Sequence, residues 1–324
     1  MNLYLRGIPY GKVFTSAGAR GFCGEGYPGH NLGLNFEGAS FITKTVTFHS
    51  REGNMPLQYD GTPSDWKPEC IVITPWMFLK GATVNAVGLS NFGAEWLLND
   101  PRLHEWPDPF LISFMAVEKT PEERIEKEYR PFIKFVRQYA YKFKSHFGFE
   151  INYTCANAGI VGGISREEIK ESSGMMASLG VPLVHKLNLL APMELVKEIA
   201  EYPYVDAITI GNAIPWNSLW RIGISPLDVY WTTTSPLEKF GGGALSGKPL
   251  FQPTLQYISA LRKMGVAKPI IACGGIFGKK DVKAMFDAGA SAIQLGSMKI
   301  HSMFWPWHVQ QVIRYANEYK IRGR

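Results

Sequence analysis

The stretch Asn152–Asn157, with the sequence NYTCAN, places a thiol between two side-chain amides. Residues 149–154 are typical of a buried strand, and Cys155 follows where that strand must end. A thiolate can accept a proton, and an amide both donates and accepts hydrogen bonds. The spacing of Asn152, Cys155 and Asn157 therefore predicts a ligand site. The alternative interpretation is a buried cysteine beside a turn that the asparagines cap.

Two glycine-containing loops could bind an anion. Gly274-Gly275 follows the apolar stretch 269–273, and Gly296-Ser297 follows the stretch 291–295. Backbone N–H groups in such loops, aided by a helix N-terminus, bind phosphate. The matched pair favours a phosphate site over plain tight turns. A phosphate fits a flavin mononucleotide and a sugar phosphate equally well.

Lys186 lies within the mostly apolar stretch 182–187. A lysine held inside a barrel can place positive charge at the N1/C2 carbonyl region of a flavin, where reduction deposits negative charge. Two other roles stay open for this residue. It could form a Schiff base, or it could pair with a carboxylate.

These residues must be positioned by short apolar stretches that alternate with amphipathic ones about eight times along the chain. The pattern predicts a single (β/α)8 TIM barrel rather than an open sheet. We expect one domain over residues 1–324, with a small antiparallel excursion near residues 48–83 and a long loop near 213–250. The predicted strands are 13–16, 40–47, 109–116, 149–154, 182–187, 205–210, 269–273 and 291–295. The predicted helices are 120–144, 192–202, 253–264, 279–288 and 302–319, with another that begins at Ser165.

The active site of such a barrel lies at the C-terminal ends of its strands. Polar residues collect at or just after the predicted strands, whereas a purely structural distribution would scatter them. They are Lys44, Asn85, Asn152, Cys155, Lys186 and Asn212.

Composition narrows the class of protein. The chain has 324 residues, 46% hydrophobic and 19% charged, and a net charge of +6 that is spread along it. The densest basic run, 137–144, alternates with aromatic residues like one helix face, and no recognition motif accompanies it. We therefore expect no nucleic-acid partner. The four cysteines show no CxxC or metal-ligand spacing, so we expect reduced thiols and no metal.

The N-terminal residues 1–12 lack the apolar core of a signal peptide, and no apolar run approaches the length of a membrane span. We therefore expect a cytoplasmic protein that has no membrane partner.

The chain resembles the dihydroorotate dehydrogenase family, in its soluble class with a cysteine base, whose members are FMN-dependent TIM barrels. The resemblance spans nearly the whole chain, from Ser16-Ala17-Gly18 to about Ser297. It is carried by ITKTVT (42–47), REGN (51–54), NAVGLSN (85–91), NYTCAN (152–157), VHKL (184–187), GGALSG (242–247) and the segment 270–297. The last segment is common to several phosphate-binding barrels, while the combination of the others is much more specific.

The resemblance implies a role for each matching residue. Cys155 is implied as the general base, and Lys44 as a catalytic residue close to flavin and substrate. The implied substrate-binding amides are Asn85, Asn152, Asn157 and Asn212. The implied FMN-binding residues are Ala17, Gly18, Lys44, Asn152, Lys186, Gly247, Gly274, Gly275, Gly296 and Ser297.

The implied reaction is the oxidation of dihydroorotate to orotate in pyrimidine biosynthesis, with proton abstraction by Cys155 and hydride transfer to flavin N5. The alternatives are an FMN enzyme acting on a related dihydropyrimidine or another CH–CH substrate, and a barrel that binds a phosphate ligand without redox activity. The family also implies a small-molecule substrate and a homodimer, with an electron-transfer subunit as a further partner. Fumarate, a quinone, and NAD through a partner all stay open as electron acceptors.

The sequence departs from the family pattern at several places. Thr154-Cys155-Ala156-Asn157 replaces Ser-Cys-Pro-Asn, and Ala213 stands where a serine or threonine is usual. Met55-Pro56-Leu57-Gln58 replaces Pro-x-Pro-Arg. The segment 214–240 carries Trp216, Trp220 and Trp231, and we expect part of the long loop to cover the substrate pocket, with packing outside the barrel or a subunit contact as the alternative.

Overall fold

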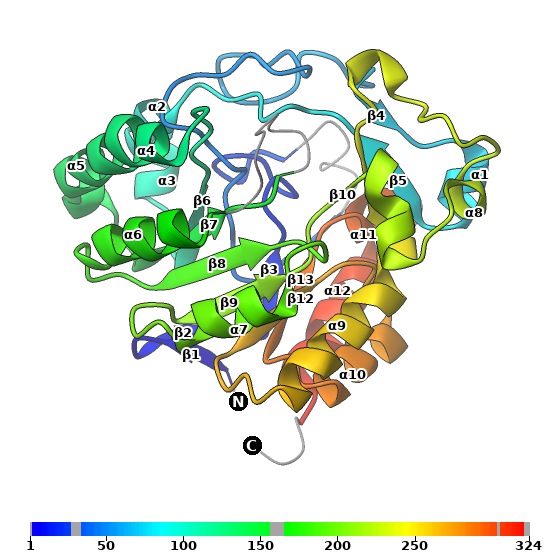
Figure 1. Ribbon diagram of the computed structural model, residues 1–324. Coiled ribbons are helices and arrows are strands. Elements are labelled where there is room, and N and C mark those ends of the chain that lie inside the picture. Colours follow the sequence, from blue (N-terminus) through cyan, green and yellow to red (C-terminus); the bar gives the residue numbers. More distant parts are fainter. Residues whose placement is uncertain (1, 27–33, 156–164, 303–304, 321–324) are drawn as a thin grey trace.

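The computed structural model describes residues 2–26, 34–155, 165–302 and 305–320. Its centre is a curled sheet of seven parallel strands in the order β3-β13-β12-β9-β8-β7-β6, which Figure 1 shows surrounded by helices. The strands are β3 (Val13–Thr15), β6 (Phe110–Phe114), β7 (Phe147–Asn152), β8 (Leu183–Leu187), β9 (Ala207–Ile210), β12 (Ile270–Cys273) and β13 (Ala292–Leu295). Each of the seven falls on a predicted strand.

The segment 40–46 closes the sheet into a barrel. It bridges β3 through Ser40 and β6 through Ile42 and Val46, always in the parallel sense. The backbone N–H of Thr43, for example, donates to the carbonyl of Leu111 over 3.0 Å. We predicted a strand over 40–47, and the segment takes that place without regular strand structure. It hydrogen-bonds first to one neighbour and then to the other, so it forms isolated bridges.

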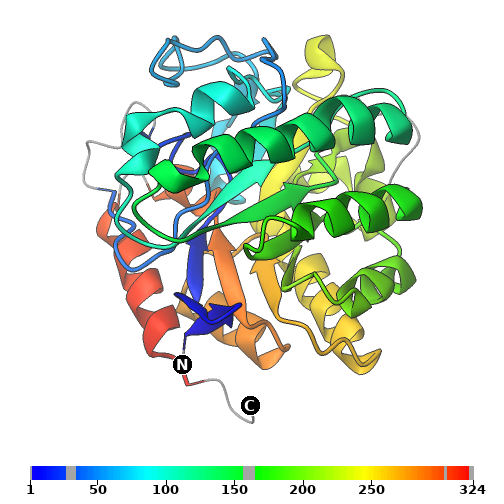
Figure 2. The same ribbon diagram turned by 90° about the vertical axis from the view of Figure 1, so that its left-hand side faces the viewer.

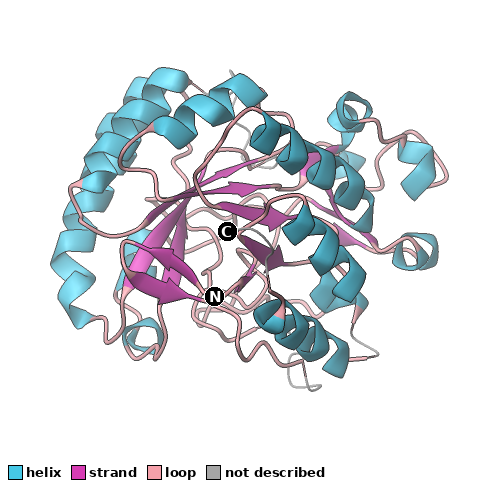
Figure 3. Ribbon diagram, turned by 90° about the horizontal axis from the view of Figure 1, so that it is seen from below, coloured by secondary structure: helices cyan, strands magenta, loops and turns pink. Residues whose placement is uncertain are grey.

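Helices form the outer layer, and Figure 3 shows them around the strands from below. The α-helices are α1 (Pro75–Leu79), α2 (Ala94–Leu98), α3 (Pro101–His104), α4 (Pro121–Glu123), α5 (Arg130–Tyr139), α6 (Arg166–Ala177), α7 (Met193–Glu201), α8 (Pro226–Val229), α9 (Phe251–Lys263), α10 (Lys279–Asp287), α11 (Met298–His301) and α12 (Trp307–Glu318). Other helical turns are η2 (Arg124–Tyr129), η3 (Ala140–Lys142), η4 (Trp216–Ile222), η5 (Glu238–Phe240) and η6 (Lys248–Leu250). Across the described ranges, no helix combines the length and the apolar character needed to cross a membrane.

The helix predicted from Thr120 begins as expected. The Thr120 hydroxyl accepts from the backbone N–H of Glu123, and the Glu123 carboxylate accepts from the backbone N–H of Thr120. This reciprocal cap satisfies two N–H groups that a helix start leaves unpaired. The helical path runs through α4, η2, α5 and η3 to residue 142, although its second part is a π-helix. That π-helix buries Arg124 against Glu168 of α6, where the guanidinium and carboxylate form two hydrogen bonds.

Two features at the chain ends differ from the prediction. The closing helix predicted over 302–319 forms as α12, which begins only after Pro306, a residue that has no N–H to donate within a helix, and the short α11 comes before the predicted start. At the other end, β1 (Leu3–Leu5) and β2 (Ile8–Tyr10) form an unpredicted hairpin. Its turn residues Arg6 and Gly7 both have positive φ, as the favoured two-residue hairpin turn requires. The hairpin lies below β3 (Figure 2) and packs Leu5 against the barrel core.

A second sheet combines the two excursions from the barrel. It is antiparallel, with the order β10-β11-β5-β4, and it lies beside the barrel in Figure 1. Strands β4 (Ile71–Val72) and β5 (Ala82–Asn85) confirm the antiparallel piece predicted near 48–83. Strands β10 (Ile214–Pro215) and β11 (Ala244–Gly247) come from the predicted long loop, which therefore contains regular structure.

We expect Phe132→Ala to destabilise the barrel by about 3–5 kcal/mol, because it removes a large, fully buried ring. The Phe132 ring stacks on Phe114 of β6 with centroids 3.9 Å apart. Urea unfolding followed by circular dichroism measures the loss. Tyr141→Ala is the matched control, because Tyr141 is 81% exposed and its loss should change the free energy of unfolding by under about 0.5 kcal/mol. Equal effects of the two substitutions would contradict the assignment of Phe132 to the core.

Candidate active site

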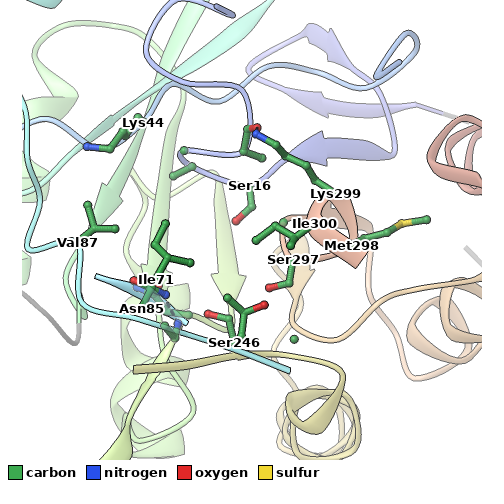
Figure 4. A pocket seen from close by; sticks show the side chains of 18 of the residues that line it. Ser16, Lys44, Ile71, Asn85, Val87, Ser246, Ser297, Met298, Lys299 and Ile300 are labelled. Atoms are coloured by element: carbon green, nitrogen blue, oxygen red, sulfur yellow. Dashed lines mark hydrogen bonds between the residues drawn. The ribbon is translucent and has the colours of Figure 1, made fainter. Parts of the chain in front are cut away.

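A cavity of about 690 Å³ opens at the C-terminal ends of the barrel strands. Figure 4 shows Lys44, Asn85 and Val87 on one side of it and Ser297 and Lys299 on the other. Thirteen of the residues singled out from the sequence line this one cavity, although they come from distant parts of the chain. They are Ala17, Gly18, Lys44, Asn85, Asn152, Cys155, Lys186, Asn212, Gly247, Gly274, Gly275, Gly296 and Ser297. Asn157 lies outside the described residues.

Two of the amides hold each other in place. Asn152 is the last residue of β7, and its Oδ1 accepts from Nδ2 of Asn212 over 3.0 Å. The same Nδ2 lies 3.1 Å from the carbonyl oxygen of Thr154, and Oδ1 of Asn212 accepts from the backbone N–H of Ala213. The amides that follow β7 and β9 are therefore oriented before any ligand arrives.

Asn85 reaches the cavity from the antiparallel sheet. It ends β5 and pairs with Ala244 on one side and Ile71 on the other. Because side chains alternate along a strand, Thr83 shares its face with Asn85, and both line the cavity together with Ile71. One face of this sheet thus forms a wall of the site.

The loop that carries Asn85 is held by the REGN element, 51–54. Nε of Arg51 donates to the carbonyl of Gly88 over 2.9 Å, and Nδ2 of Asn54 donates to the carbonyl of Ala86 over 2.7 Å. Gly53 has a φ of +59°, and a Cβ there would lie 2.3 Å from the Ser90 hydroxyl. This element therefore shapes the cavity wall from behind.

Cys155 lies just past the end of β7, half-buried, and lines the cavity. It packs against the small cluster of Leu89 and Met115. None of the four cysteines is in a disulfide, as expected.

Lys44 lies on the closing segment 40–46 and is buried. Its ammonium donates to the carbonyl of Ser90 and lies 4.6 Å from the centroid of the Phe22 ring. Burial lowers the pKa of Lys44 to about 7, and the nearby Cys155 thiol and Glu25 carboxylate oppose that shift. Protonated, this side chain places a positive charge near Cys155.

Lys186, on β8, is buried at the base of the cavity. Its Nζ lies 3.1 Å from Oε1 of Glu150 and 3.2 Å from Oε1 of Gln294. Of the roles left open for this lysine, the pairing with a carboxylate is therefore present. Lys186 forms this ion pair and also lines the cavity, so the pairing does not exclude contact with a ligand.

The glycine loops after β12 and β13 form the far end of the cavity. Gly275 has a φ of +66°, and a Cβ there would lie 2.7 Å from the backbone nitrogen of Phe251. Gly247, at the end of β11, has a φ of +103°, and a Cβ there would lie 2.0 Å from the carbonyl oxygen of Gly81. Backbone geometry alone thus demands glycine at both positions, and at Gly275 the tight-turn interpretation holds alongside the phosphate one.

Several lining residues were missed by sequence reasoning. Lys299 of α11 lines the cavity near Ser297, and its Nζ donates to the carbonyl of Ala19 over 2.8 Å. Burial lowers the pKa of Lys299 to about 7. The sequence did contain a signal for Lys299, because this lysine follows the predicted phosphate loop Gly296-Ser297 by two residues. No comparable signal marked Ile71 or Trp66, because their excursion reads as irregular.

The tryptophans of the long loop do not cover the cavity. Trp216 is buried away from it, and Trp220 and Trp231 are 73% and 62% exposed. None of the three is among the lining residues, which include only Ala213, Ser246, Gly247 and Leu250 from this loop. The three rings therefore do not line the cavity, although the two ends of the long loop do, and Trp66 of the other excursion contacts it. The expectation that part of the long loop covers the substrate pocket stays a prediction.

The lining of the cavity suits a planar ring with a phosphate better than it suits a metal ion. In the ranges that the structure describes, no three His, Cys, Asp or Glu side chains gather as metal ligands. The cavity instead offers neutral amides from the second sheet and from the barrel strands, an ammonium at its base, and glycine loops at the far end. This arrangement matches a planar ring that is joined to a phosphate.

We expect the free energy of unfolding to depend on pH through Lys44. Its ordinary pKa is 10.5 and its folded pKa is about 7. Between these values the unfolded chain binds a proton that the folded chain does not, so stability rises with pH over this window. Urea unfolding of the wild type and of Lys44→Met at several pH values measures the effect. The advantage of Lys44→Met should be largest below pH 7 and should shrink toward pH 10; a constant difference would contradict the lowered pKa.

Known proteins resemble this chain over most of its length. The family model described as dihydroorotate dehydrogenase matches residues 11–316. The dihydroorotate dehydrogenase (quinone) of Methylococcus capsulatus is 27% identical over 66% of this chain and 62% of its own length, so the chain spans less than two thirds of that relative. The dihydroorotate dehydrogenase A (fumarate) of Limosilactobacillus reuteri is 27% identical over 87% of this chain and 82% of its own. The dihydroorotate dehydrogenase B (NAD(+)) catalytic subunit of Anoxybacillus flavithermus is 28% identical over 82% of this chain and 74% of its own.

Solved structures match the fold as well. The DHODH of Eimeria tenella in complex with ferulenol superposes with a TM-score of 0.69 at 17% identity, over 97% of this chain and 82% of that one. This likeness supports the barrel, while the sequence match carries the assignment. Since the family model spans the barrel from before β3 to within α12, the chain belongs to the dihydroorotate dehydrogenase family.

Proposed function

We propose that this chain oxidises dihydroorotate to orotate, the redox step of pyrimidine biosynthesis, with FMN as its cofactor. One observation carries the proposal: the Cys155 thiol shares a single cavity with Lys44, Lys186 and the glycine loops. A flavin dehydrogenase of this type requires a base, a positive charge that stabilises the reduced flavin, and a binding site for the phosphate of the cofactor.

Each residue takes a role from its place in the cavity. FMN, when bound, would supply N5 as the acceptor of the hydride from the substrate. Cys155 takes the proton from the carbon next to the substrate carbonyl. Lys44, close to this thiol, favours its thiolate form whenever the lysine is protonated. Asn85, Asn152 and Asn212, with Asn157, bind the imide and carboxylate groups of the ring.

The cofactor would lie across the base of the cavity. Lys186 would stabilise the negative charge that reduction places on the ring. Asn152 and Lys44 would contact both ring and substrate. The backbones of Ala17, Gly18, Gly247, Gly274, Gly275, Gly296 and Ser297 would surround the ribityl chain and the phosphate. Lys299 joins these residues in the proposal, since an ammonium beside Ser297 suits a phosphate.

The proposal extends to the domain organisation, the location and the partners of the protein. We infer that residues 1–324 form one FMN-binding barrel domain and that the protein works in the cytoplasm as a homodimer. A relative described as a catalytic subunit supports an electron-transfer subunit as a further partner. The relatives' descriptions include quinone, fumarate and NAD(+), so assays with each acceptor are needed.

One departure bears on the substrate. Ala213 lines the cavity beside Asn212, where the family usually has a hydroxyl. The substrate side therefore has one hydrogen-bonding group fewer, which favours a related dihydropyrimidine as the second candidate. Comparing dihydroorotate with dihydrouracil, which lacks the carboxylate, separates the two substrates in one assay.

We expect the protein to bind about one FMN per chain, because a single cavity contains both the Lys186 ammonium and the glycine loops. Absorbance of the purified protein, and fluorescence of flavin released on denaturation, measure the content. Dihydroorotate should then bleach the bound flavin without oxygen. A protein that stays colourless after incubation with FMN would contradict the cofactor, and bound flavin that no dihydropyrimidine bleaches would contradict the substrate class.

Replacing Cys155 should slow flavin reduction by roughly 10²–10⁴, the contribution of a positioned base. Cys155→Ser should keep the fold and FMN, and Cys155→Ala should be at least as slow. Rising pH should recover part of the rate in the wild type, as the thiolate fraction grows, and much less in the serine variant. Stopped-flow absorbance measures the rates. Cys23→Ala, which removes a buried thiol that does not line the cavity, is the control. A rate for Cys155→Ala within a few-fold of wild type would exclude the base role.

A further inference from the structure

Four polar side chains meet inside the barrel below the cavity. They come from four different strands and are almost completely buried, with exposures of 0% to 3%. They are Glu150 of β7, Lys186 of β8, Thr209 of β9 and Gln294 of β13. Lys186 and Gln294 line the cavity, whereas Glu150 and Thr209 do not. Neither Glu150 nor Thr209 has a role in the proposed reaction so far.

Hydrogen bonds connect all four side chains. Oε1 of Glu150 accepts from Nζ of Lys186 over 3.1 Å, and Oε2 accepts from the Thr209 hydroxyl over 3.0 Å and from the Gln294 amide. The Gln294 carbonyl oxygen accepts from Lys186 over 3.2 Å. The ammonium, the carboxylate and the amide thus form a closed ring of hydrogen bonds. Each carboxylate oxygen has a donor, as a buried charge requires.

The network decides the charge of Lys186. Burial by itself lowers the pKa of this lysine, but the attraction and hydrogen bond of Glu150, together with the influence of two cysteines, outweigh burial, and the pKa is raised. The other titratable groups that act on Lys186 are the thiols of Cys273 and Cys155, whose influence is in the same direction. Burial raises the pKa of Cys273, which keeps that thiol neutral. Glu150 is therefore the one carboxylate among the groups that act on Lys186 in the described part of the chain.

The pair is also oriented. Lys186 lies at the cavity surface and Glu150 lies behind it, so the positive end of the pair points toward the ligand. A buried ion pair is weak evidence for stability, because neutral side chains of similar volume often replace it without loss. Its orientation toward a redox site suggests a role in function instead.

We propose that Glu150 is a positioning residue for the redox step, which holds Lys186 protonated and directed at FMN and so sets how strongly the site favours the reduced cofactor. This inference rests on the proposed function, because it requires FMN in the cavity. Glu150 does not reach the cavity surface, so it acts through the residues that it holds there, and Lys186 is the charged one.

The test is the midpoint potential of bound FMN, measured from pH 6 to pH 10 by equilibration with reference dyes. In Glu150→Gln at low pH, Lys186 carries an unbalanced positive charge, so the potential should lie above that of the wild type. As pH rises, the unpaired lysine should lose its proton, and the potential should fall below that of the wild type. The two curves should cross. On either side the ratio of reduced to oxidised FMN should differ on the order of tenfold, the effect of one nearby charge.

Two variants separate charge from structure. Thr209→Val removes one hydrogen bond to Glu150 but keeps both charges, so its curve should run parallel to the wild type without crossing. Glu150→Gln/Lys186→Met removes both charges, so its potential should lie below the wild type at every pH. If Glu150→Gln alone fails to fold, rescue of folding in this double variant supports the proposal, because the unpaired ammonium is then the cause. Failure of the double variant to fold would assign the pair a purely structural role.

Other outcomes overturn the inference. A Glu150→Gln curve that follows the wild type at every pH would show that Glu150 does not hold the charge of Lys186. A double variant with the wild-type potential would show that Lys186 does not act on FMN. Both results presuppose wild-type protein that binds FMN and is reduced by a dihydropyrimidine. A wild type that binds no FMN would instead refute the proposed function.

Discussion

Closure of the parallel sheet is the constraint on which the site depends. The segment 40–46 hydrogen-bonds to β3 on one side and to β6 on the other, which joins the two edges of the seven-stranded sheet. Because all barrel strands are parallel, their C-terminal ends then meet around one opening. Residues as distant as Ser16, Asn152 and Ser297 thereby line one cavity. The closing segment also carries Lys44, so the same contacts that complete the barrel deliver a charge to the site.

Burial affects the two central lysines in opposite ways because their partners differ. Lys44 donates to a backbone carbonyl and lies over an aromatic ring, and neither can neutralise its charge, so desolvation lowers its pKa. Lys186 faces the carboxylate of Glu150, and its pKa is raised. Of these two ammonium groups, Lys186 stays charged over the working pH range and Lys44 titrates near neutrality. The proposed chemistry uses the constant charge at the cofactor and the titrating charge beside the proposed base.

The second sheet gives the barrel a wall that its own strands do not provide. It pairs β5 with β11 across more than 150 residues of chain and places Asn85 and Thr83 against the ligand space. Ile71 and Trp66 give that wall an apolar part beside the polar one. The REGN element fixes the backbone of the Asn85 loop and does not line the cavity. Family motifs can therefore mark residues that shape a site as well as residues that contact the ligand.

The sequence by itself was enough to predict the barrel and most of the polar residues that line the cavity at the C-terminal ends of its strands. Strand and helix periods are local, so alternation revealed seven of the barrel strands, and Lys44, Asn152, Cys155 and Lys186 were visible as polar residues at strand ends. Only the tertiary structure decided how these groups are paired. Glu150 reads as an ordinary strand residue until β8 and β13 bring Lys186 and Gln294 to it. The pairing of β5 with β11 and the alternating bridges of the closing segment were hidden for the same reason, because these hydrogen bonds join residues far apart in the chain, and no local pattern encodes such a partner.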